Sequence, residues 1–375
     1  MGLGDQDVGS SLFGTPALVG ITRGLAEFRA GRPVLMTNES TSLAALPVEG
    51  LNAERLSAFA MLCAPALPRL VVTTRRALAI GVVSAAPVAL RIDEDIDADA
   101  IVALVADAKC GHAVVAVPAG PAAIAAIEMA KLAQVLPAVL VAEATPAMEA
   151  LDPAIASVAV DAVTRFHDDR IQSLAISGEA QVPLNSGVRT RFVVFRDAIG
   201  ESPVAVIVGN PDLSRPTPVR LHSACLTGDV FGSRRCDCGD QLKSSLKRLA
   251  ATGGGIIIYL AQEGRGLGLS NKMRAYQLQD AGLDTVDANT TLGFDDDERN
   301  YGIAARMLQM LGCTQVVLLT NNPAKLDGLA KEGIEIVGRV PLETPINADN
   351  RRYMTAKAAR SGHRLDHLMA SLAKP

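Results

Sequence analysis

The chain has 375 residues, enough for two ordinary domains, and 49% of them are hydrophobic, which excludes a disordered protein. Aromatic residues make up only 3% and Trp is absent, so Ala and Val must fill the cores. The formal net charge of −4 argues against a nucleic-acid partner, because such proteins carry a basic surface. An anionic ligand must therefore be held by a local cluster of Arg and Lys.

The start of the chain does not have the layout of a signal peptide, because Asp5 and Asp7 stand where basic residues would be. The apolar run 113–130 is interrupted by Pro and Glu residues, so we expect no membrane partner. A cytoplasmic location is the expectation, and cysteines in that compartment stay reduced. Three scattered cysteines in apolar surroundings are expected to be buried free thiols: Cys63, Cys110 and Cys313.

The first 185 residues alternate short apolar strands with Ala-rich helical patterns, as α/β folds do. The expected helices are 18–30, 53–63, 98–106 and 122–135. The expected strands are 34–36, 70–73, 113–117 and 138–141. The turn-like Asn185-Ser186-Gly187 precedes a β-branched run, and we place the domain boundary there, giving domains 1–185 and 186–375.

The second domain also alternates strands and helices, so the whole chain is predicted to be α/β (α+β) in two domains. Its expected strands are 188–195, 204–208, 219–222, 256–259, 316–320 and 334–340. Its expected helices are 241–251, 271–279, 298–311, 324–332 and a basic helix from 348 to about 363.

Cys225, Cys236 and Cys238 are crowded together in the segment HSACLTGDVFGSRRCDCGDQL. Closely spaced thiolates in a reducing compartment are typical zinc ligands. Three thiolates leave one position of a tetrahedral ion open, and a catalytic zinc uses that position for a water whose pKa it lowers. His222 could instead close a structural site, and the spacing alone leaves both alternatives open. Zinc held by three cysteines also activates water against ring carbons in nucleobase deaminases.

Three further segments carry polar groups. The turn from Gln262 to Gly268 is Gly-rich, so its backbone can approach a ligand closely, and a packing turn would need neither Glu263 nor Arg265. The segment 320–325, TNNPAK, follows a strand and enters a helix, where phosphate or purine groups bind in α/β sheets, although an ordinary cap would look the same. The run 295–299, DDDER, begins with acids that suit a solvated helix N-terminus.

Together and in this order, the four segments resemble GTP cyclohydrolase II, the enzyme that commits GTP to riboflavin synthesis. The resemblance runs from about 204 to 365 and includes the phrases NKMRAYQLQD, DTVDAN, LGFDDDER and LLTNNPAK. It implies an open, catalytic zinc site, with one Zn²⁺ per subunit, on a mixed sheet flanked by helices, and a homodimer. The implied reaction opens the imidazole ring of GTP, releases formate and pyrophosphate, and gives 2,5-diamino-6-(5-phosphoribosylamino)pyrimidin-4-one.

The resemblance also implies roles for single residues. Cys225, Cys236 and Cys238 would bind zinc, whose water attacks C8 of guanine. Asp297 matches the family's proton acceptor, and Tyr276 would lie near the zinc water. Arg299 matches the residue assigned as nucleophile toward the α-phosphate; because a guanidinium stays protonated, phosphate stabilisation is the safer role.

The remaining implied contacts are to the nucleotide. Arg and Lys suit the triphosphate, Glu263 would accept hydrogen bonds from guanine, and Mg²⁺ would neutralise the leaving pyrophosphate. The matching positions are Arg220, Gln241, Glu263, Gly264, Arg265, Thr285, Thr320 and Lys325.

Two residues depart from the family's pattern. Ala224 stands where the family has Glu, and Ala261 where it has Arg, so charge is missing near the expected pocket. This keeps open a paralogue that opens a pyrimidine nucleotide such as UTP. A non-catalytic nucleotide-binding regulator is a third hypothesis, against which the zinc cysteines, Tyr276, Asp297 and Arg299 argue.

The N-terminal half faintly resembles 3,4-dihydroxy-2-butanone 4-phosphate synthase, at 29–34 and 136–143. The acidic metal-binding run of that family is replaced here by 37–42, TNESTS. Without clustered carboxylates there is nothing to hold Mg²⁺. We therefore expect this degenerate domain to be non-catalytic and retained for packing, dimerisation or regulation.

Overall fold

The computed structural model describes residues 14–39, 41–93, 95–108, 115–149, 151, 154–360, 362 and 365. The chain folds into two compact units that do not follow its linear halves. The first unit consists of Met1–Asp169, Ser270–Leu283 and Asp287–Asp297. The second consists of Arg170–Leu269, Asp284–Val286 and Glu298–Pro375. Two segments from late in the sequence therefore complete the unit that the N-terminal half begins.

The first unit is built on a seven-stranded sheet in the order β5-β4-β3-β6-β2-β1-β7. All its pairs are antiparallel except β1 with β7, which is parallel. The central strand β6 is buried along five of its six residues, as the apolar run AVLVA requires. The strands are β1 (Val34–Thr37), β2 (Ser42–Pro47), β3 (Arg69–Val72), β4 (Val88–Arg91), β5 (Ala116–Pro118), β6 (Ala138–Glu143) and β7 (Ala156–Ala159).

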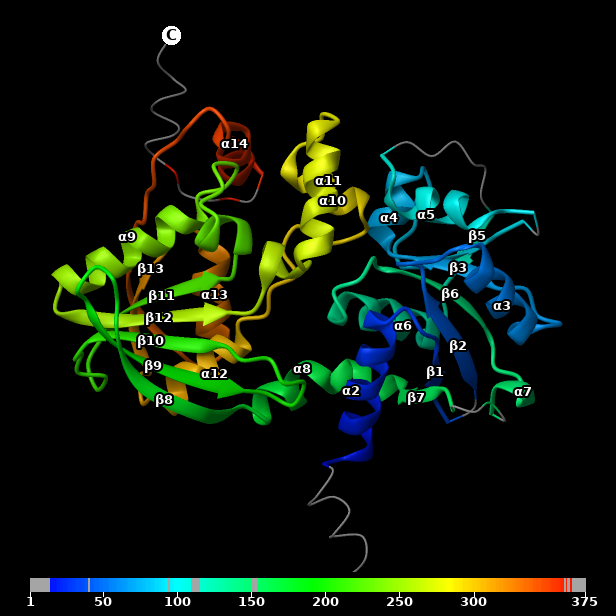
Figure 1. The fold of residues 1–375 in the computed structure, drawn as a ribbon, viewed down its shortest axis with the longest axis horizontal. Helices are drawn as coiled ribbons and strands as arrows, with labels where there is room; N and C mark the ends of the chain where they lie inside the picture. Colours follow the sequence, from blue (N-terminus) through cyan, green and yellow to red (C-terminus); the bar gives the residue numbers. More distant parts are fainter. Residues whose placement is uncertain are drawn as a thin grey trace, which may run out of the picture. The chain divides into compact units, whose positions relative to one another are not determined.

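Small residues let the helices of this unit approach closely. Gly24 in α2 leaves no room for a larger side chain, because a Cβ there would lie 2.5 Å from Cγ2 of Val158 on β7. In α6, seven residues of an Ala-rich sequence are buried. The helices are α2 (Pro16–Arg29), α3 (Ala53–Cys63), α4 (Thr74–Ala79), α5 (Ala98–Ala106), α6 (Pro121–Leu132) and α7 (Pro146–Glu149), with the later α10 (Leu269–Asp280) and most of α11 (Thr285–Thr291) (Figure 1). Helix α8 (Val160–Gln172) contains the division between the units.

The second unit is built on another seven-stranded sheet, in the order β14-β13-β11-β12-β10-β9-β8. Strands β8, β9, β10 and β12 pair antiparallel, whereas β12, β11, β13 and β14 run parallel. The bounds are β8 (Ala175–Pro183), β9 (Arg189–Arg196), β10 (Val204–Gly209), β11 (Thr217–Ser223), β12 (Gly254–Leu260), β13 (Gln315–Leu319) and β14 (Glu335–Val340).

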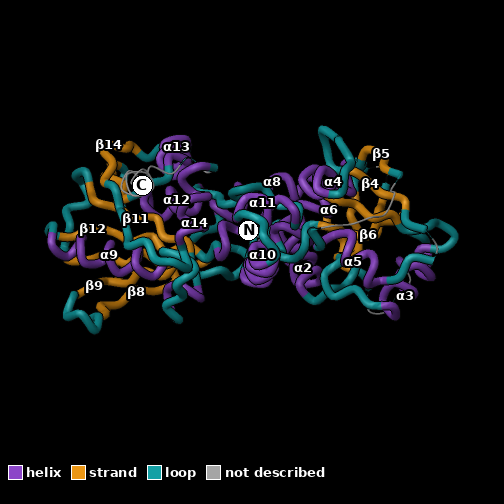
Figure 2. The backbone as a smooth tube through the Cα atoms, turned by 90° about the horizontal axis from the view of Figure 1, so that it is seen from above, coloured by secondary structure: helices purple, strands orange, loops and turns teal. Residues whose placement is uncertain are grey.

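Helices cover both faces of this second sheet. Leu249 of α9 (Cys238–Ala251) packs with Val206 and Ile257 on one face. Met307 of α12 (Gly302–Met310) and Leu329 of α13 (Pro323–Lys331) belong to the core on the other face. Figure 2 shows the strands in orange between purple helices. Helix α14 (Arg351–Ala359) follows β14.

The expected α/β fold in two domains is confirmed, but the expected boundary at 185/186 falls inside the second unit. Asn185-Ser186-Gly187 forms the hairpin turn between β8 and β9, where the amide of Leu184 donates to the carbonyl of Val188 at 2.9 Å. The compact units divide at Asp169/Arg170 instead. The sequence did not indicate β8 because almost every residue of that edge strand is exposed, which leaves no alternation to detect.

The scattered cysteines and the apolar helices were also subjects of expectation. Cys63 and Cys313 are buried free thiols, as expected, and burial raises the pKa of Cys63 to about 11; Cys110 lies outside the described residues. Within the described part of the chain, no helix combines the length and the apolar character needed to cross a membrane.

Candidate metal centre and nucleotide site

Three neighbouring parallel strands of the second unit end at the segments that the sequence singled out. Strand β11 leads to Cys225, β12 leads to Glu263, and β13 leads to Thr320. Because these strands are adjacent in the order β13-β11-β12 and point the same way, the three segments share one edge of the sheet. Ligands of α/β proteins bind at this carboxyl edge.

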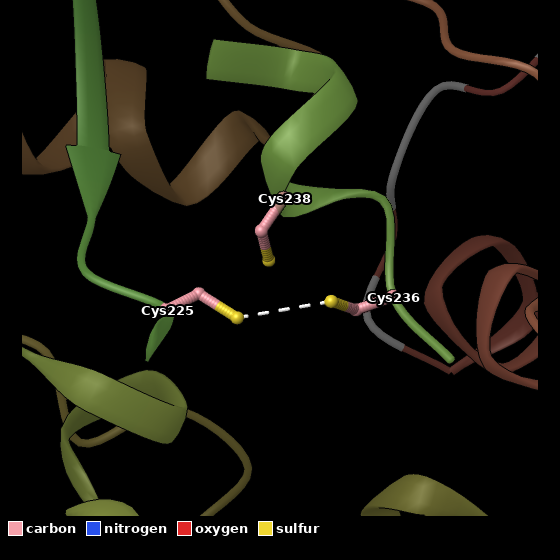
Figure 3. A group of neighbouring side chains, drawn as sticks. All are labelled: Cys225, Cys236 and Cys238. Atoms are coloured by element: carbon pink, nitrogen blue, oxygen red, sulfur yellow. Dashed lines mark hydrogen bonds between the residues drawn. The ribbon is translucent and has the colours of Figure 1, made fainter. Parts of the chain in front are cut away.

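The three cysteines converge at that edge. Cys225 follows β11, Cys236 lies in the next loop, and Cys238 begins α9, with their sulfurs directed toward one another (Figure 3). The three Sγ atoms lie within 4.8 Å of one another, and those of Cys225 and Cys236 are 3.7 Å apart. Zinc–sulfur bonds of about 2.3 Å at tetrahedral angles place two sulfurs about 3.8 Å apart. The donor set and its spacing therefore fit Zn²⁺.

A close backbone approach makes room for the cluster. After Cys225 the chain forms one turn of π-helix, Leu226–Val230. A Cβ on Gly228 in this turn would lie 2.8 Å from Sγ of Cys236 and 3.1 Å from Sγ of Cys225. A Cβ on Gly239 would lie only 2.3 Å from the carbonyl oxygen of Gly228. Both positions require glycine, because any side chain would enter the space of the thiols or of the backbone beside them.

The neighbouring thiols disfavour the charged form of Cys238. Hydrogen bonds with Cys225 and Cys236, together with burial, raise the pKa of Cys238 well above its usual range. A cluster of this kind holds three thiolates only when a cation compensates their charge.

His222 does not complete the thiol cluster. Its Nε2 lies 3.0 Å from both carboxylate oxygens of Asp229, and Oδ2 of that carboxylate also accepts hydrogen bonds from the hydroxyl of Tyr259 and the amide of Cys225. The His222 and Tyr259 rings stack at 5.5 Å. Among the described residues, the group able to hold a metal consists of the three cysteines alone. The alternative of a structural zinc closed by His222 is therefore disfavoured.

Cationic side chains lie beside the cluster. Arg220 on β11 is 5% exposed; its Nη1 donates to the carbonyl of Leu319 at 3.1 Å and its Nη2 donates to Oε1 of Gln241. Its buried Nε has no hydrogen-bond partner among the described residues. The pKa of Arg220 is lowered to about 10, mainly by burial; the charge of Asp237 opposes this, and the charge of Arg299 acts in the same direction as burial. Arg220 therefore stays cationic near neutral pH.

Lys325 and Thr320 are held at the end of β13. The Nζ of Lys325 donates to the carbonyl of Leu221 at 2.7 Å, although the residue is only 5% exposed. Thr320 is buried, and its hydroxyl accepts from the amide of Asn322, which caps α13. Two buried cations, Arg220 and Lys325, thus flank the carboxyl end of β11.

The Gly-rich turn has a left-handed backbone. Gly264 and Arg265 have φ of 63° and 66°, which is unusual for a residue with a side chain such as Arg265. The carbonyl of Arg265 accepts from the amide of Glu298 at 3.1 Å. The Oε2 of Glu263 accepts from the amide of Leu226 at 2.6 Å, so this carboxylate holds the first residue of the π-helical turn. The hydrogen bond between Glu263 and Leu226 therefore connects the Gly-rich turn to the segment that follows Cys225.

A family model described as GTP cyclohydrolase II matches residues 175–341. The GTP cyclohydrolase-2 of Azospirillum brasilense is 40% identical over 363 residues, which cover 92% of this chain and 94% of that protein. The chain belongs to the GTP cyclohydrolase II family. The riboflavin biosynthesis protein RibBA of Parabacteroides distasonis is 45% identical over 201 residues, 53% of this chain and 49% of that protein.

The comparison with solved structures also found a loose likeness. A two-domain 3,4-dihydroxy-2-butanone 4-phosphate synthase from A. baumannii matches 87% of this chain and 99% of its own, at 15% identity and a TM-score of 0.32. So loose a likeness supports no conclusion about the first unit, and the absence of synthase activity there stays a prediction.

The residues matched to this family are divided between the two units. Tyr276 on α10 and Asp297 belong to the first unit, where Nζ of Lys272 lies 5.7 Å from the ring centre of Tyr276. Arg299 belongs to the second unit, with its guanidinium 5.8 Å from the ring centre of Tyr301. Thr285 also belongs to the second unit and is 9% exposed. The second unit contains all the other predicted site residues.

Sequence reasoning missed a buried ion pair beside the cluster. Asp237, between two of the cysteines, is 1% exposed and accepts from Nζ of Lys357 at 2.7 Å and from Nε2 of Gln241 at 2.6 Å. Burial disfavours the charge of Lys357, but Asp237 outweighs burial and raises the pKa of Lys357. The same Nζ lies 4.5 Å from the ring centre of Tyr353. Asp237 could have been suspected from its position in the cysteine motif, whereas nothing local marked Lys357.

Proposed function

We propose that the protein is a zinc-dependent GTP cyclohydrolase II. It opens the imidazole ring of GTP, releases formate and pyrophosphate, and makes 2,5-diamino-6-(5-phosphoribosylamino)pyrimidin-4-one in the first step of riboflavin biosynthesis. The observation that carries this proposal is the trio of thiols beside buried cations at the carboxyl edge of three parallel strands. Membership of the family supplies the substrate class.

Cys225, Cys236 and Cys238 are the proposed ligands of one Zn²⁺ per subunit. The ion, when bound, supplies a water whose pKa is lowered toward neutrality and which can therefore act as a nucleophile near pH 7. The engagement of His222 with Asp229 supports an open fourth position for that water. The hydrogen bond from the amide of Cys225 to Asp229 fixes the backbone that presents the first thiolate.

Cations of the second unit are proposed to hold the triphosphate. Arg220 offers the buried, unpartnered Nε described above, and an anionic oxygen is the best acceptor for such a donor. Lys325 and Arg299 add positive charge, and Mg²⁺ would bind with the phosphates. Arg299 acts here as a phosphate-stabilising group, because its guanidinium keeps its proton.

The other proposed nucleotide contacts are made by the residues that the sequence resemblance indicated. Glu263 accepts hydrogen bonds from the guanine edge while holding the amide of Leu226, so base binding is coupled to the π-helical turn after Cys225. The left-handed turn at Gly264 and Arg265 exposes backbone for the nucleotide. Gln241, Thr285 and Thr320 complete the set.

Asp297 and Tyr276 are the proposed proton-handling groups. A carboxylate suits acceptance of the proton that leaves the attacking water, and a phenol can pass a hydrogen bond to an oxygen of the opening ring. Both roles come from matching positions in the family. Removal of either group should lower turnover without removing zinc, because neither is a zinc ligand.

The test is to incubate purified, zinc-loaded protein with Mg²⁺ and either GTP or UTP, and to follow formate, pyrophosphate and the ultraviolet absorbance of the product. Formate and a diaminopyrimidine from GTP alone would support the proposal. Consumption of UTP with GTP untouched would replace it with a pyrimidine-nucleotide hydrolase, the alternative that Ala224 and Ala261 keep open. Tight binding of GTP without any product would indicate a non-catalytic regulator.

The homodimer is proposed from family membership. Light scattering on the eluting peak of a size-exclusion column gives the mass directly, to be compared with the 39.1 kDa of one chain. A mass of one chain across the working concentration range would contradict the dimer.

A further inference from the structure

The segment that carries Asp297 is fastened to the first unit by side chains from the N-terminal half. The hydroxyl of Thr73 donates to the carbonyl of Gly293 at 2.7 Å, and Nη1 of Arg76 donates to the carbonyl of Thr291 at 2.7 Å. Both contacts lie within the first unit and are buried. Two carbonyl groups just ahead of Asp297 are therefore held by residues more than 200 positions earlier.

Arg76 is an unusual residue to find in a core. It is 1% exposed and is the largest fully buried side chain among the described residues. Its Nε donates to the carbonyl of Leu104 at 2.9 Å, and its Nη2 donates to the carbonyls of Ala103 at 3.3 Å and Asp107 at 2.9 Å. These three oxygens lie at the C-terminus of α5, which carries partial negative charge. One guanidinium thus joins the ends of α5 and α11.

The chain between these fixed carbonyls has little freedom. Gly293 has φ of +91°, and a Cβ there would lie 2.9 Å from Oγ1 of Thr73 and 3.1 Å from Cγ of Pro137. Leu292 and Phe294 on either side are 1% and 0% exposed. The path that leads to Asp297 is therefore set by packing and hydrogen bonds at successive residues.

Helix α10, which lies almost entirely in the segment 270–283, is also held by residues of the N-terminal half. On α10, Nδ2 of Asn271 donates to the carbonyl of Gln134 at 3.0 Å, and Nη1 of Arg274 donates to Oε2 of Glu49 at 2.9 Å. Asn271 is 0% exposed, and the same Glu49 oxygen accepts the amide of Leu136 at 3.0 Å. These bonds hold the helix that carries Tyr276.

We propose that Thr73 and Arg76 are positioning residues for the reaction, because they hold the carbonyls of Gly293 and Thr291 and thereby set the place of Asp297. The N-terminal half then has a role in the reaction, because it holds the segment that carries Asp297. This inference rests on the proposed function. It assigns a role in the reaction to the N-terminal half, for which the sequence offered only packing, dimerisation or regulation.

The test compares Arg76→Met with Arg75→Met in the full-length, zinc-loaded protein. Met keeps the length of the side chain but none of its donors. For Arg76→Met we expect kcat for formate release from GTP to fall by about tenfold or more, because small displacements of a reacting group cost that much. The KM for GTP and the zinc content should stay near wild type, since the proposed phosphate and zinc groups belong to the second unit.

Arg75→Met is the matched control. Arg75 lies beside Arg76 and pairs with Asp295 at 2.7 Å, but both of these side chains are about half exposed. An exposed ion pair contributes little to the stability of the local structure, so kcat should stay within about twofold of wild type. Hydrogen exchange adds a readout that does not depend on activity: amides 292–297 should exchange faster in Arg76→Met, while those of the zinc loop 225–238 should not.

If Arg76→Met does not fold, Thr73→Val and Thr73→Ser decide the question. Ser keeps the hydroxyl that donates to Gly293 and should retain turnover, whereas Val should lower kcat with zinc retained. Wild-type kcat in a folded Arg76→Met or in Thr73→Val would overturn the inference. So would equal losses of zinc, GTP affinity and turnover in Arg76→Met, which would reveal a purely structural residue. A wild-type protein that does not open GTP would overturn the proposed function itself.

Discussion

Lys357 and Asp237 form a buried ion pair, with 2.7 Å between Nζ and Oδ1, across 120 positions of sequence. Asp237 lies between Cys236 and Cys238, so the pair connects α14 to the loop that presents the thiols. Gln241 donates to the other oxygen of Asp237 and accepts from Arg220. Helix α14 is thereby linked to both the metal cluster and a proposed phosphate-binding cation.

Lys357→Met should destabilise the protein by about 3–5 kcal/mol, because it leaves the carboxylate of Asp237 buried without its cation. Urea unfolding of zinc-loaded protein, followed by circular dichroism, measures this loss. Arg360→Met is the matched control: Arg360 pairs with Asp284 at 2.7 Å, and both side chains are partly exposed to solvent, so removal should cost no more than about 1 kcal/mol. Equal midpoints for the two variants would contradict this account of the buried pair.

Cys236→Ser should lose zinc and all ring opening while the fold of the first unit is unchanged, because the ligand is replaced and the first unit contains none of the cysteines of the cluster. Zinc per chain is measured by atomic absorption, and turnover by formate release. Cys313→Ser serves as the control, since Cys313 is a buried thiol of the same unit outside the cluster and should keep its zinc. Retained turnover in Cys236→Ser would defeat the zinc mechanism.

Gly228→Ala should weaken zinc binding by about tenfold or more, because the new Cβ would lie 2.8 Å from Sγ of Cys236 and push a ligand out of place. Competition with a chromophoric chelator measures the affinity. Gly178→Ala is the control, since a Cβ there meets nothing within 4 Å. If both variants bound zinc like wild type, the glycine would not be shaping the site.

Burial lowers the pKa of His222 below its ordinary value of 6.5, although the hydrogen bond to Asp229 opposes this. The unfolded chain therefore takes up a proton on this histidine at a higher pH than the folded protein does. Stability should fall as pH drops below about 6.5, by at most about 1.4 kcal/mol per pH unit from this group. In His222→Gln, this contribution to the pH dependence of stability should be absent.

The measurement is the urea midpoint of both proteins between pH 7 and pH 5. The difference between them isolates the histidine, because loss of zinc in acid affects both. Parallel curves for the two proteins would show that His222 binds its proton equally in the folded and unfolded states.

Much of the site was predictable because its signals are local. Cys225, Cys236 and Cys238 lie within one short stretch of sequence, and the strands before Glu263 and Thr320 show plain apolar runs, so their carboxyl ends could be placed from sequence. The parallel pairing that brings these ends together follows from the alternation of strands and helices.

The other features could not be predicted, because they depend on contacts between residues far apart in the sequence. Arg76 reaches Thr291 across 215 positions, and Lys357 reaches Asp237 across 120, so no periodicity or motif links the partners. The assignment of residues 270–283 and 287–297 to the first unit could not be predicted for the same reason, because the resemblance in sequence follows the linear chain and not its packing. The edge strand β8 was missed because it is exposed on both faces.

The passage of residues 270–283 and 287–297 into the first unit has a consequence for synthesis on the ribosome. Domains usually fold in the order in which they emerge. Here the N-terminal sheet can form early, but Arg76 has no Thr291 to bond, and Gly293 and Phe294 are absent from their places, until most of the chain has been made. The first unit therefore cannot complete its hydrogen bonds and packing until residues 287–297 have been synthesised, so the N-terminal half does not finish folding before much of the second unit has also been made.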